Sequence, residues 1–181
     1  MSKKKKYTKH YYLDQLGLKP EDYDLSSYCK DPDRSKKDRK RLKKKHEKYG
    51  FWDSDTWSLD FTTALWVYEH LMSYRDTASE IIDMSDKVSI HLIHPRTDAA
   101  ESELRDAVIN RGKKDVKKII FKSETRRMSV YDAIGAITDD FARYLTNNDT
   151  YKDALLKDFE NTAYLQNAMH NYTDLLPGLW W

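Results

Sequence analysis

Histidine and cysteine are the side chains that most often bind transition metals, and neither is spaced for that role in this sequence. His91 and His94 are three positions apart, which in a strand places them on opposite faces. His70 follows Glu69 directly, which is not the arrangement of a zinc-protease helix. The single cysteine, Cys29, excludes a cysteine-based zinc site and a disulfide framework. We therefore expect neither a metal nor a cofactor.

Acidic side chains gather where a helix is predicted to begin. Asp53, Asp55 and Asp60 lie beside tryptophans at this point. Carboxylates in such a group can hold magnesium in a nuclease, but acids at a helix start also cap free N–H groups and interact favourably with the helix dipole. We favour capping over a metal site. Asp139 and Asp140 fall in the middle of another predicted helix, where we expect a solvated face.

No residue pattern indicates nucleophilic catalysis. Neither Cys29 nor any serine has a base at a suitable spacing. Five glycines and four prolines in the whole chain argue against a glycine-rich nucleotide-binding loop, a propeller or a β-sandwich. The sequence therefore predicts a protein that is not an enzyme.

The strongest functional signal is a run of basic residues. Arg34 to Lys48 contains ten Lys and Arg but only two acids. This density can bind phosphates by releasing counterions. A solvated helix face, or an arm folded over an acidic part of the same chain, would give the same pattern. The candidate nucleic-acid-binding residues are Lys36, Lys37, Arg39, Lys40, Arg41, Lys43, Lys44 and Lys45.

The basic run belongs to a larger charge asymmetry. Residues 1–48 carry 17 Lys and Arg against 8 Asp and Glu, a net charge of +9, whereas the other 133 residues have a net charge of −7. We therefore divide the chain into a basic, Tyr- and Lys-rich segment (1–50) and an acidic helical domain (51–181). Five tyrosines lie among the lysines of the first segment and could stack on bases or anchor the segment to the helical body. They are Tyr7, Tyr11, Tyr12, Tyr23 and Tyr28.

The elements that would position these residues are mainly helical. A basic helix is expected from a cap at Asp33 or Ser35 to Gly50, without an apolar stripe because Leu42 is its only large aliphatic residue. Apolar residues at helical spacing predict a helix over about 58–80. Further helices are predicted from cap signals at Asp98, Ser129 and Thr150, the first closed by Gly112 and the second by Asn147 and Asn148.

Alternating apolar residues predict a strand at Val88–Leu92, stopped by Pro95. Val116–Phe121 is consistent with a second strand or with the end of a helix. The fold class is therefore mainly α (α+β): a helical bundle-like body with a small two-stranded β element and a basic N-terminal segment. No run approaches the roughly 20 apolar residues of a membrane-spanning helix, and the lysines near the start precede no apolar segment. We expect no membrane contact and a cytoplasmic location.

Asp55–Thr62 (DTWSLDFT), continuing into the predicted helix, resembles a segment of small proteins from bacteriophages and mobile elements of Firmicutes. A second similarity covers Lys118–Leu145, and the two together cover about a third of the chain. Among such proteins, size and charge make this chain similar to the type II anti-CRISPR proteins, which inhibit Cas9.

The resemblance implies a non-enzymatic inhibitor, located in the cytoplasm of a bacterial host cell, that binds the Cas9–guide RNA complex and blocks target DNA binding or cleavage. The acidic domain would mimic DNA on the positive channel of Cas9, or the basic arm would grip guide RNA or DNA. The strongly basic arm departs from the uniformly acidic pattern of simple DNA mimics. The alternative is a small phage-type DNA- or RNA-binding regulator unrelated to Cas9.

Overall fold

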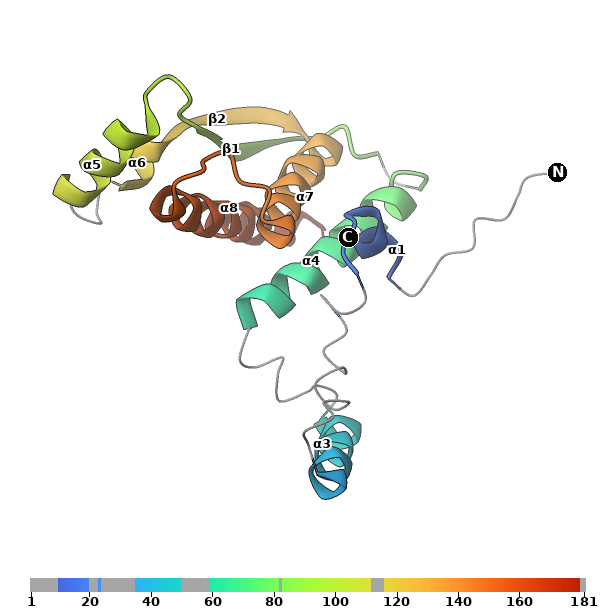
Figure 1. Ribbon diagram of the computed structural model, residues 1–181. Helices are drawn as coiled ribbons and strands as arrows, with labels where there is room; N and C mark the ends of the chain where they lie inside the picture. Colours follow the sequence, from blue (N-terminus) through green and yellow to red (C-terminus); the bar gives the residue numbers. More distant parts are fainter. Residues whose placement is uncertain are drawn as a thin grey trace. The chain divides into compact units, whose positions relative to one another are not determined.

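The computed structural model describes residues 10–19, 23, 35–49, 59–81, 83–111 and 116–179 (Figure 1). The chain forms two compact units, Met1–Glu69 and His70–Trp181. The predicted boundary between residues 50 and 51 lies outside the described residues and stays a prediction. The elements, in chain order, are α1 (Tyr11–Gln15), α3 (Lys36–Tyr49), α4 (Leu59–Ala78), β1 (Lys87–Pro95), α5 (Glu101–Arg111), α6 (Val116–Ile120), β2 (Phe121–Ser129), α7 (Val130–Thr146), α8 (Ala154–Leu175) and a final 3-10 turn, η3 (Leu176–Leu179).

These elements confirm the mainly α-helical fold with a small two-stranded antiparallel sheet. The helix expected between Ser35 or Asp33 and Gly50 is present as α3, and the helix expected over about 58–80 is present as α4. The strand at Val88–Leu92 extends at both ends to become β1. No helix among the described residues is long and apolar enough to cross a membrane.

In the first unit, the residue before α1 contacts the middle of α4. Leu13 is almost fully buried, and His10 Nδ1 lies 3.1 Å from Oε2 of Glu69. Tyr23 packs its ring 5.0 Å from that of His10, and its hydroxyl donates to Asp14 Oδ1 at 2.7 Å. Both of these contacts of Tyr23 lie within the N-terminal segment, and the predicted anchoring of the tyrosines to the helical body stays a prediction.

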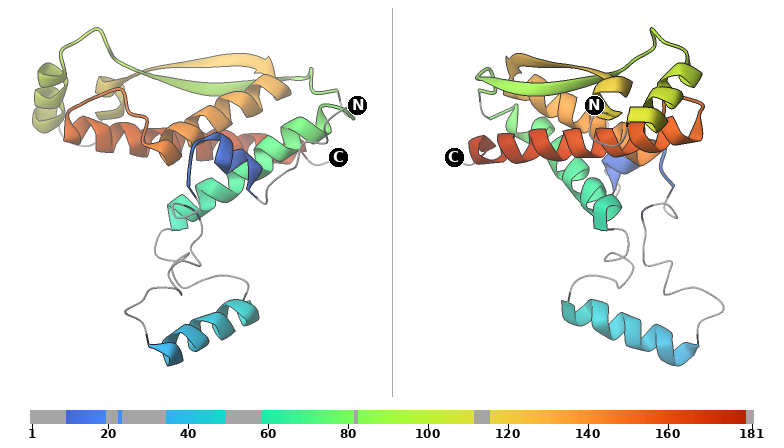
Figure 2. Two further views of the ribbon diagram at one scale, coloured as in Figure 1. Left: turned by 45° about the vertical axis from the view of Figure 1, so that its right-hand side comes forward. Right: turned by 90° about the vertical axis from the view of Figure 1, so that its left-hand side faces the viewer.

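In the second unit, the β1–β2 ribbon lies across the antiparallel pair α7 and α8 (Figures 1 and 2). Ile134, Ile137 and Phe141 recur at i, i+3 and i+7 on α7 and are fully buried. From the ribbon, Ile90 and Ile93 are buried as well. Ile93 belongs to an apolar cluster with residues of α5, α6 and α8, and Ile90 lies on the opposite face of a regular strand, so both faces of β1 are covered at these positions.

The ends of α7 follow the predicted cap residues. Ser129 Oγ accepts a hydrogen bond from the N–H of Asp132 at 3.1 Å, and Asn147 adopts a left-handed conformation with φ of 48° at the C-terminal end. The next helix begins later than predicted. Asp153 rather than Thr150 caps α8, because its carboxylate accepts from the N–H groups of the first helical turn.

The ambiguous segment Val116–Phe121 is helical up to Ile120, and the second strand begins only at Phe121. Val116, Ile119 and Ile120 are buried together with residues of α5 and α8, which explains why a short helix forms there. The six residues after Phe121 are all exposed, so β2 has none of the apolar alternation by which strands are recognised in a sequence.

Candidate nucleic-acid interface

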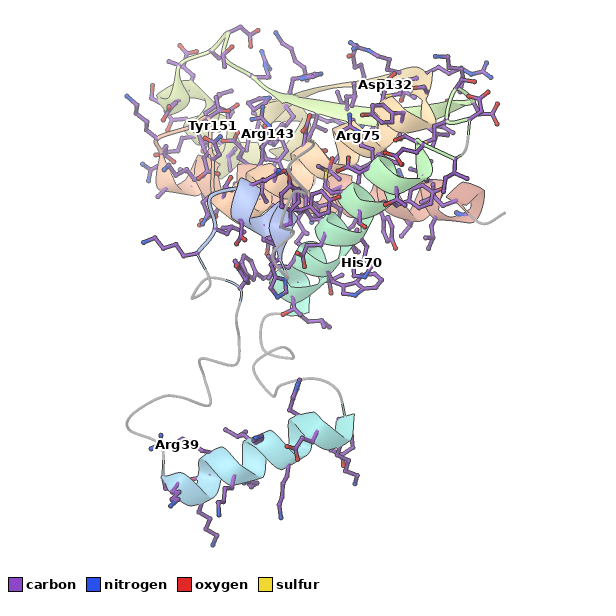
Figure 3. The ribbon with its side chains drawn as sticks, turned by 90° about the vertical axis from the view of Figure 1, so that its right-hand side faces the viewer. Arg39, His70, Arg75, Asp132, Arg143 and Tyr151 are labelled. Carbon is purple, nitrogen blue, oxygen red and sulfur yellow. The ribbon has the colours of Figure 1, made fainter. Side chains whose placement is uncertain are left out.

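The eight predicted nucleic-acid-binding residues all lie on α3, and all eight are exposed. Figure 3 shows the long side chains of this helix, Arg39 among them, projecting on several sides. The helix carries nine Lys and Arg against two acids, which gives it a net charge of +7. It therefore concentrates positive charge on a single element of the first unit.

The basic residues cover more than half of the helix circumference. At 3.6 residues per turn, Lys43 and Lys45 mark the two limits of an arc around the helix axis. This arc spans roughly 200° of the helix surface. Lys37, Arg41 and Lys44, at i, i+4 and i+7, form the middle of this surface, which we call the basic face. Such spacing places three positive side chains in one row along the axis.

The opposite side of α3 carries a narrow covered stripe. Asp38, Leu42 and His46 recur at intervals of four, and they are the three residues of α3 that are not exposed. Leu42 retains only 3% of its accessible surface. Leu42 is the only apolar member of this stripe, so α3 lacks an apolar stripe, as the sequence predicted. The residues of the basic face are exposed.

Local contacts stabilise α3 without neutralising it. Ser35 Oγ accepts from the N–H of Asp38 at 3.1 Å and donates to its carboxylate at 2.6 Å, which caps the first turn at one of the two predicted positions. Arg41 and Asp38 approach to 3.8 Å, and Lys43 and Glu47 to 4.0 Å. These are exposed ion pairs within the helix, which contribute little to stability and remain available for exchange with a phosphate.

The other sequence candidates do not assemble into a reaction centre in the part of the chain that is described. Asp60 lies in the first turn of α4, consistent with the preferred capping role, while Asp53 and Asp55 lie outside the described residues. Within the described ranges, no three His, Cys, Asp or Glu side chains are grouped as a metal site requires. Tyr7 and Tyr28 also lie outside these ranges.

Sequence reasoning missed a buried polar cluster between β1, α7 and α8. Asn167 Nδ2 donates to Asp140 Oδ2 at 2.8 Å and to the carbonyl of His91 at 2.9 Å. Asn171 donates to the same carbonyl at 2.7 Å and accepts from the N–H of His91 at 3.0 Å. Both asparagines are almost fully buried. Their hydrogen bonds join the ribbon to the helix pair.

The electrostatics of this cluster reflect its burial. Loss of hydration raises the pKa of the Asp140 carboxyl to about 6, against the opposing effects of the Asn167 hydrogen bond and the Arg143 and Lys117 charges. Burial, followed by the positive charges of Lys117 and His170, lowers the pKa of His91. The prediction of a solvated face holds for Asp139, which is exposed, but is wrong for Asp140.

The difference between Asp139 and Asp140 could have been predicted from their spacing to the apolar residues of α7. Asp140 is three positions after Ile137 and one before Phe141, at the border of the buried face, whereas Asp139 lies on the opposite side. A carboxylate at that border must find a hydrogen-bond donor, and Asn167 is the donor. This cluster has a structural role, since its polar atoms hold the backbone of β1.

Comparison with known proteins adds no assignment to this geometry. No protein-family model matches the chain, and no curated protein or solved structure matches it. The interpretation of α3 therefore depends on its own residues.

Proposed function

We propose that the protein is a non-enzymatic nucleic-acid-binding protein and that the basic face of α3 contacts phosphates. The observation that carries this proposal is the exposure of eight basic side chains on one helix. Only residues 38, 42 and 46 of that helix are not exposed. A helix of 14 residues is about 21 Å long. Because duplex DNA carries one charge per about 1.7 Å of its axis, this length can meet several phosphates.

Four of these cations are available to a partner. Lys36, Lys37, Lys40 and Lys44 are exposed and form no ion pair with any described residue. Their ammonium groups can therefore contact the phosphates of a polyanion.

The target we propose, from the resemblance to type II anti-CRISPR proteins, is the Cas9–guide RNA complex, in which binding would block recognition or cleavage of target DNA. Cas9 lines its nucleic-acid channel with positive charge, so the basic face of α3 would be repelled by the bare channel and attracted by the guide RNA or the DNA within it. The alternative, a regulator that binds DNA or RNA without Cas9, uses the same face.

The first experiment removes the middle of the basic face. The triple variant Lys37→Gln/Arg41→Gln/Lys44→Gln keeps good helix formers at these positions but lowers the net charge by three. We expect weaker binding to DNA or RNA and a salt dependence whose slope, log K against log salt concentration, falls by up to about 3, since each phosphate contact contributes about 0.9.

The matched control is Lys87→Gln/Lys118→Gln/Lys152→Gln, which removes three exposed lysines of the second unit. It lowers the net charge of the protein equally, so its salt slope should stay close to that of the wild type. Equal losses in the two triple variants would refute a specific role for α3 and leave only an effect of total charge.

The second experiment tests the target. DNA cleavage by Cas9–guide RNA is measured with and without the protein, beside a reaction that contains the protein and DNA but no Cas9. Inhibition that the α3 triple variant loses supports the proposed target. Binding to nucleic acid alone without inhibition would instead identify a regulator, and cleavage in the reaction without Cas9 would contradict the non-enzymatic assignment.

A further inference from the structure

The outer edge of β2 lies on the side of the strand away from β1. β1 and β2 pair in a continuous antiparallel register from Lys87 opposite Ser129 to Pro95 opposite Phe121. β1 packs against α8 and so lies between α8 and β2, which faces away on the other side of the ribbon (Figure 2). The side chains from Lys122 to Arg127 are all exposed.

The outer edge of β1, by contrast, is covered at His91 by side-chain amides. The N–H of His91 donates to Asn171 Oδ1, and the carbonyl of His91 accepts from Asn167 and Asn171. Asn171 thus replaces the two hydrogen bonds that a neighbouring strand would make to one residue. Covering an edge in this way prevents another strand from pairing with it.

These hydrogen bonds also establish which groups β2 presents at its own edge. Since the N–H and C=O of His91 point away from β2, His91 and its register partner Thr125 form a non-hydrogen-bonded pair. The N–H and C=O of Thr125 therefore point away from β1. By alternation, so do those of Ser123 and Arg127. Among the described residues, no group is hydrogen-bonded to this edge.

We propose that β2 pairs antiparallel with β2 of a second copy of this chain, around a two-fold axis between the two Thr125 residues. Thr125 of each copy would exchange both backbone hydrogen bonds with Thr125 of the other. The two ribbons would join into one four-stranded sheet, and the interface would be isologous. This dimer is independent of nucleic-acid binding by α3.

The charges of β2 are self-complementary in this register. Glu124 of one copy lies opposite Arg126 of the other, and the symmetry repeats the pair. Such residues occupy non-hydrogen-bonded positions, where cross-strand side chains approach most closely. Ser123 lies opposite Arg127, and Lys122 opposite Met128, so no like charges face each other directly. Within one copy Glu124 already contacts Arg126 and His94, and these exposed contacts can extend across the axis.

The decisive experiment reverses one charge at a time and then recombines the variants. Sedimentation of the full-length wild type should show a concentration-dependent dimer. Glu124→Arg places two pairs of arginines across the axis, and Arg126→Glu places two pairs of glutamates. The dimer dissociation constant of each variant should be about tenfold or more higher than that of the wild type, since each cross-strand charge pair becomes repulsive.

Mixing the two single variants should restore association as a heterodimer, because every arginine then faces a glutamate. The double variant Glu124→Arg/Arg126→Glu should dimerise by itself for the same reason. Glu103→Arg, on the exposed side of α5, is the matched control and should sediment as the wild type does. Circular dichroism of each variant verifies that it is folded.

A cysteine at the axis provides an independent measurement. In a Cys29→Ser background, Thr125→Cys should form a disulfide-linked dimer on mild oxidation, since the Cα atoms of a hydrogen-bonded pair lie about 5.5 Å apart. Thr77→Cys, an exposed residue of α4, should not form one at the same protein concentration. Three outcomes would overturn the proposal: a wild type that stays monomeric, a dimer insensitive to both charge reversals, or single variants that fail to recombine. The edge of β2 would then bind another partner, or its charges would protect it from pairing.

Discussion

Replacement of Asp140 by asparagine should stabilise this protein, in a manner that depends on pH. Asp140 is enclosed by α7, α8 and β1, and its carboxylate accepts one hydrogen bond from Asn167 at 2.8 Å. Asn can accept the same hydrogen bond through its carbonyl oxygen and occupies nearly the same volume. The substitution therefore removes a buried charge while it keeps the geometry of the polar cluster.

The size of the effect follows from the pKa of this carboxyl, which burial raises from 3.8 to about 6. Below pH 3.8 the group is protonated in the folded and the unfolded chain, and Asp and Asn should be equivalent. Between pH 3.8 and about 6 the unfolded chain loses its proton first, so the wild type loses stability as the pH rises. Above that range the penalty reaches its full value, about 3 kcal/mol.

The assay is urea denaturation of wild type and Asp140→Asn at pH 4, 5, 6 and 7.5. We expect the difference in free energy of unfolding to grow from near zero to about 3 kcal/mol in favour of the variant. The control is Asp139→Asn, which changes the neighbouring, exposed carboxylate and should stay within about 0.5 kcal/mol of the wild type. A variant that is less stable at pH 7.5, or equally stabilised at every pH, would refute the reasoning.

Two further predictions concern the packing of the second unit. Gly135→Ala in α7 should raise the free energy of unfolding by about 0.5–1 kcal/mol in chemical denaturation, because alanine favours the helix. The new Cβ would meet Nη1 of Arg75 at 3.4 Å, and the Arg75 guanidinium is stacked 4.1 Å from the centre of the Tyr131 ring. Lower stability of the variant would show that the Arg75 side chain cannot move aside. Tyr151→Phe should cost about 1–2 kcal/mol in thermal unfolding, because the buried hydroxyl donates to the carbonyl of Ile120 at 2.8 Å. Unchanged stability would show that this carbonyl is satisfied by its other donor, the N–H of Arg96.

Features that depend on neighbouring residues were predictable. The cap at Ser129, the left-handed end at Asn147 and the basic character of α3 each follow from side chains within a few positions of one another. The core face of α7 follows from the spacing of its apolar residues. In these places local preference and tertiary packing favour the same conformation.

β2 was not predictable by the same reasoning, because a strand needs a partner distant in sequence. Phe121 to Ser129 pairs with residues well before it in the chain, from Pro95 back to Lys87, and its exposed side chains carry no alternating pattern. Likewise, nothing near Asp140 in the sequence indicates the amide of Asn167, which comes from the next helix. These features result from contacts between segments, and one-dimensional spacing does not contain them.

The sequence by itself determined the charge of this protein and the helix that carries most of it, since charge is a property of composition and helix formation is largely local. Only the tertiary structure decided that Leu42 is covered while the basic face of α3 is exposed, and that the asparagines of α8 cover one edge of the ribbon. The physical reason is that burial and backbone hydrogen bonds between strands are decided by which distant segments meet. The open edge of β2, with Glu124 and Arg126 on either side of Thr125, became visible only once that pairing was known.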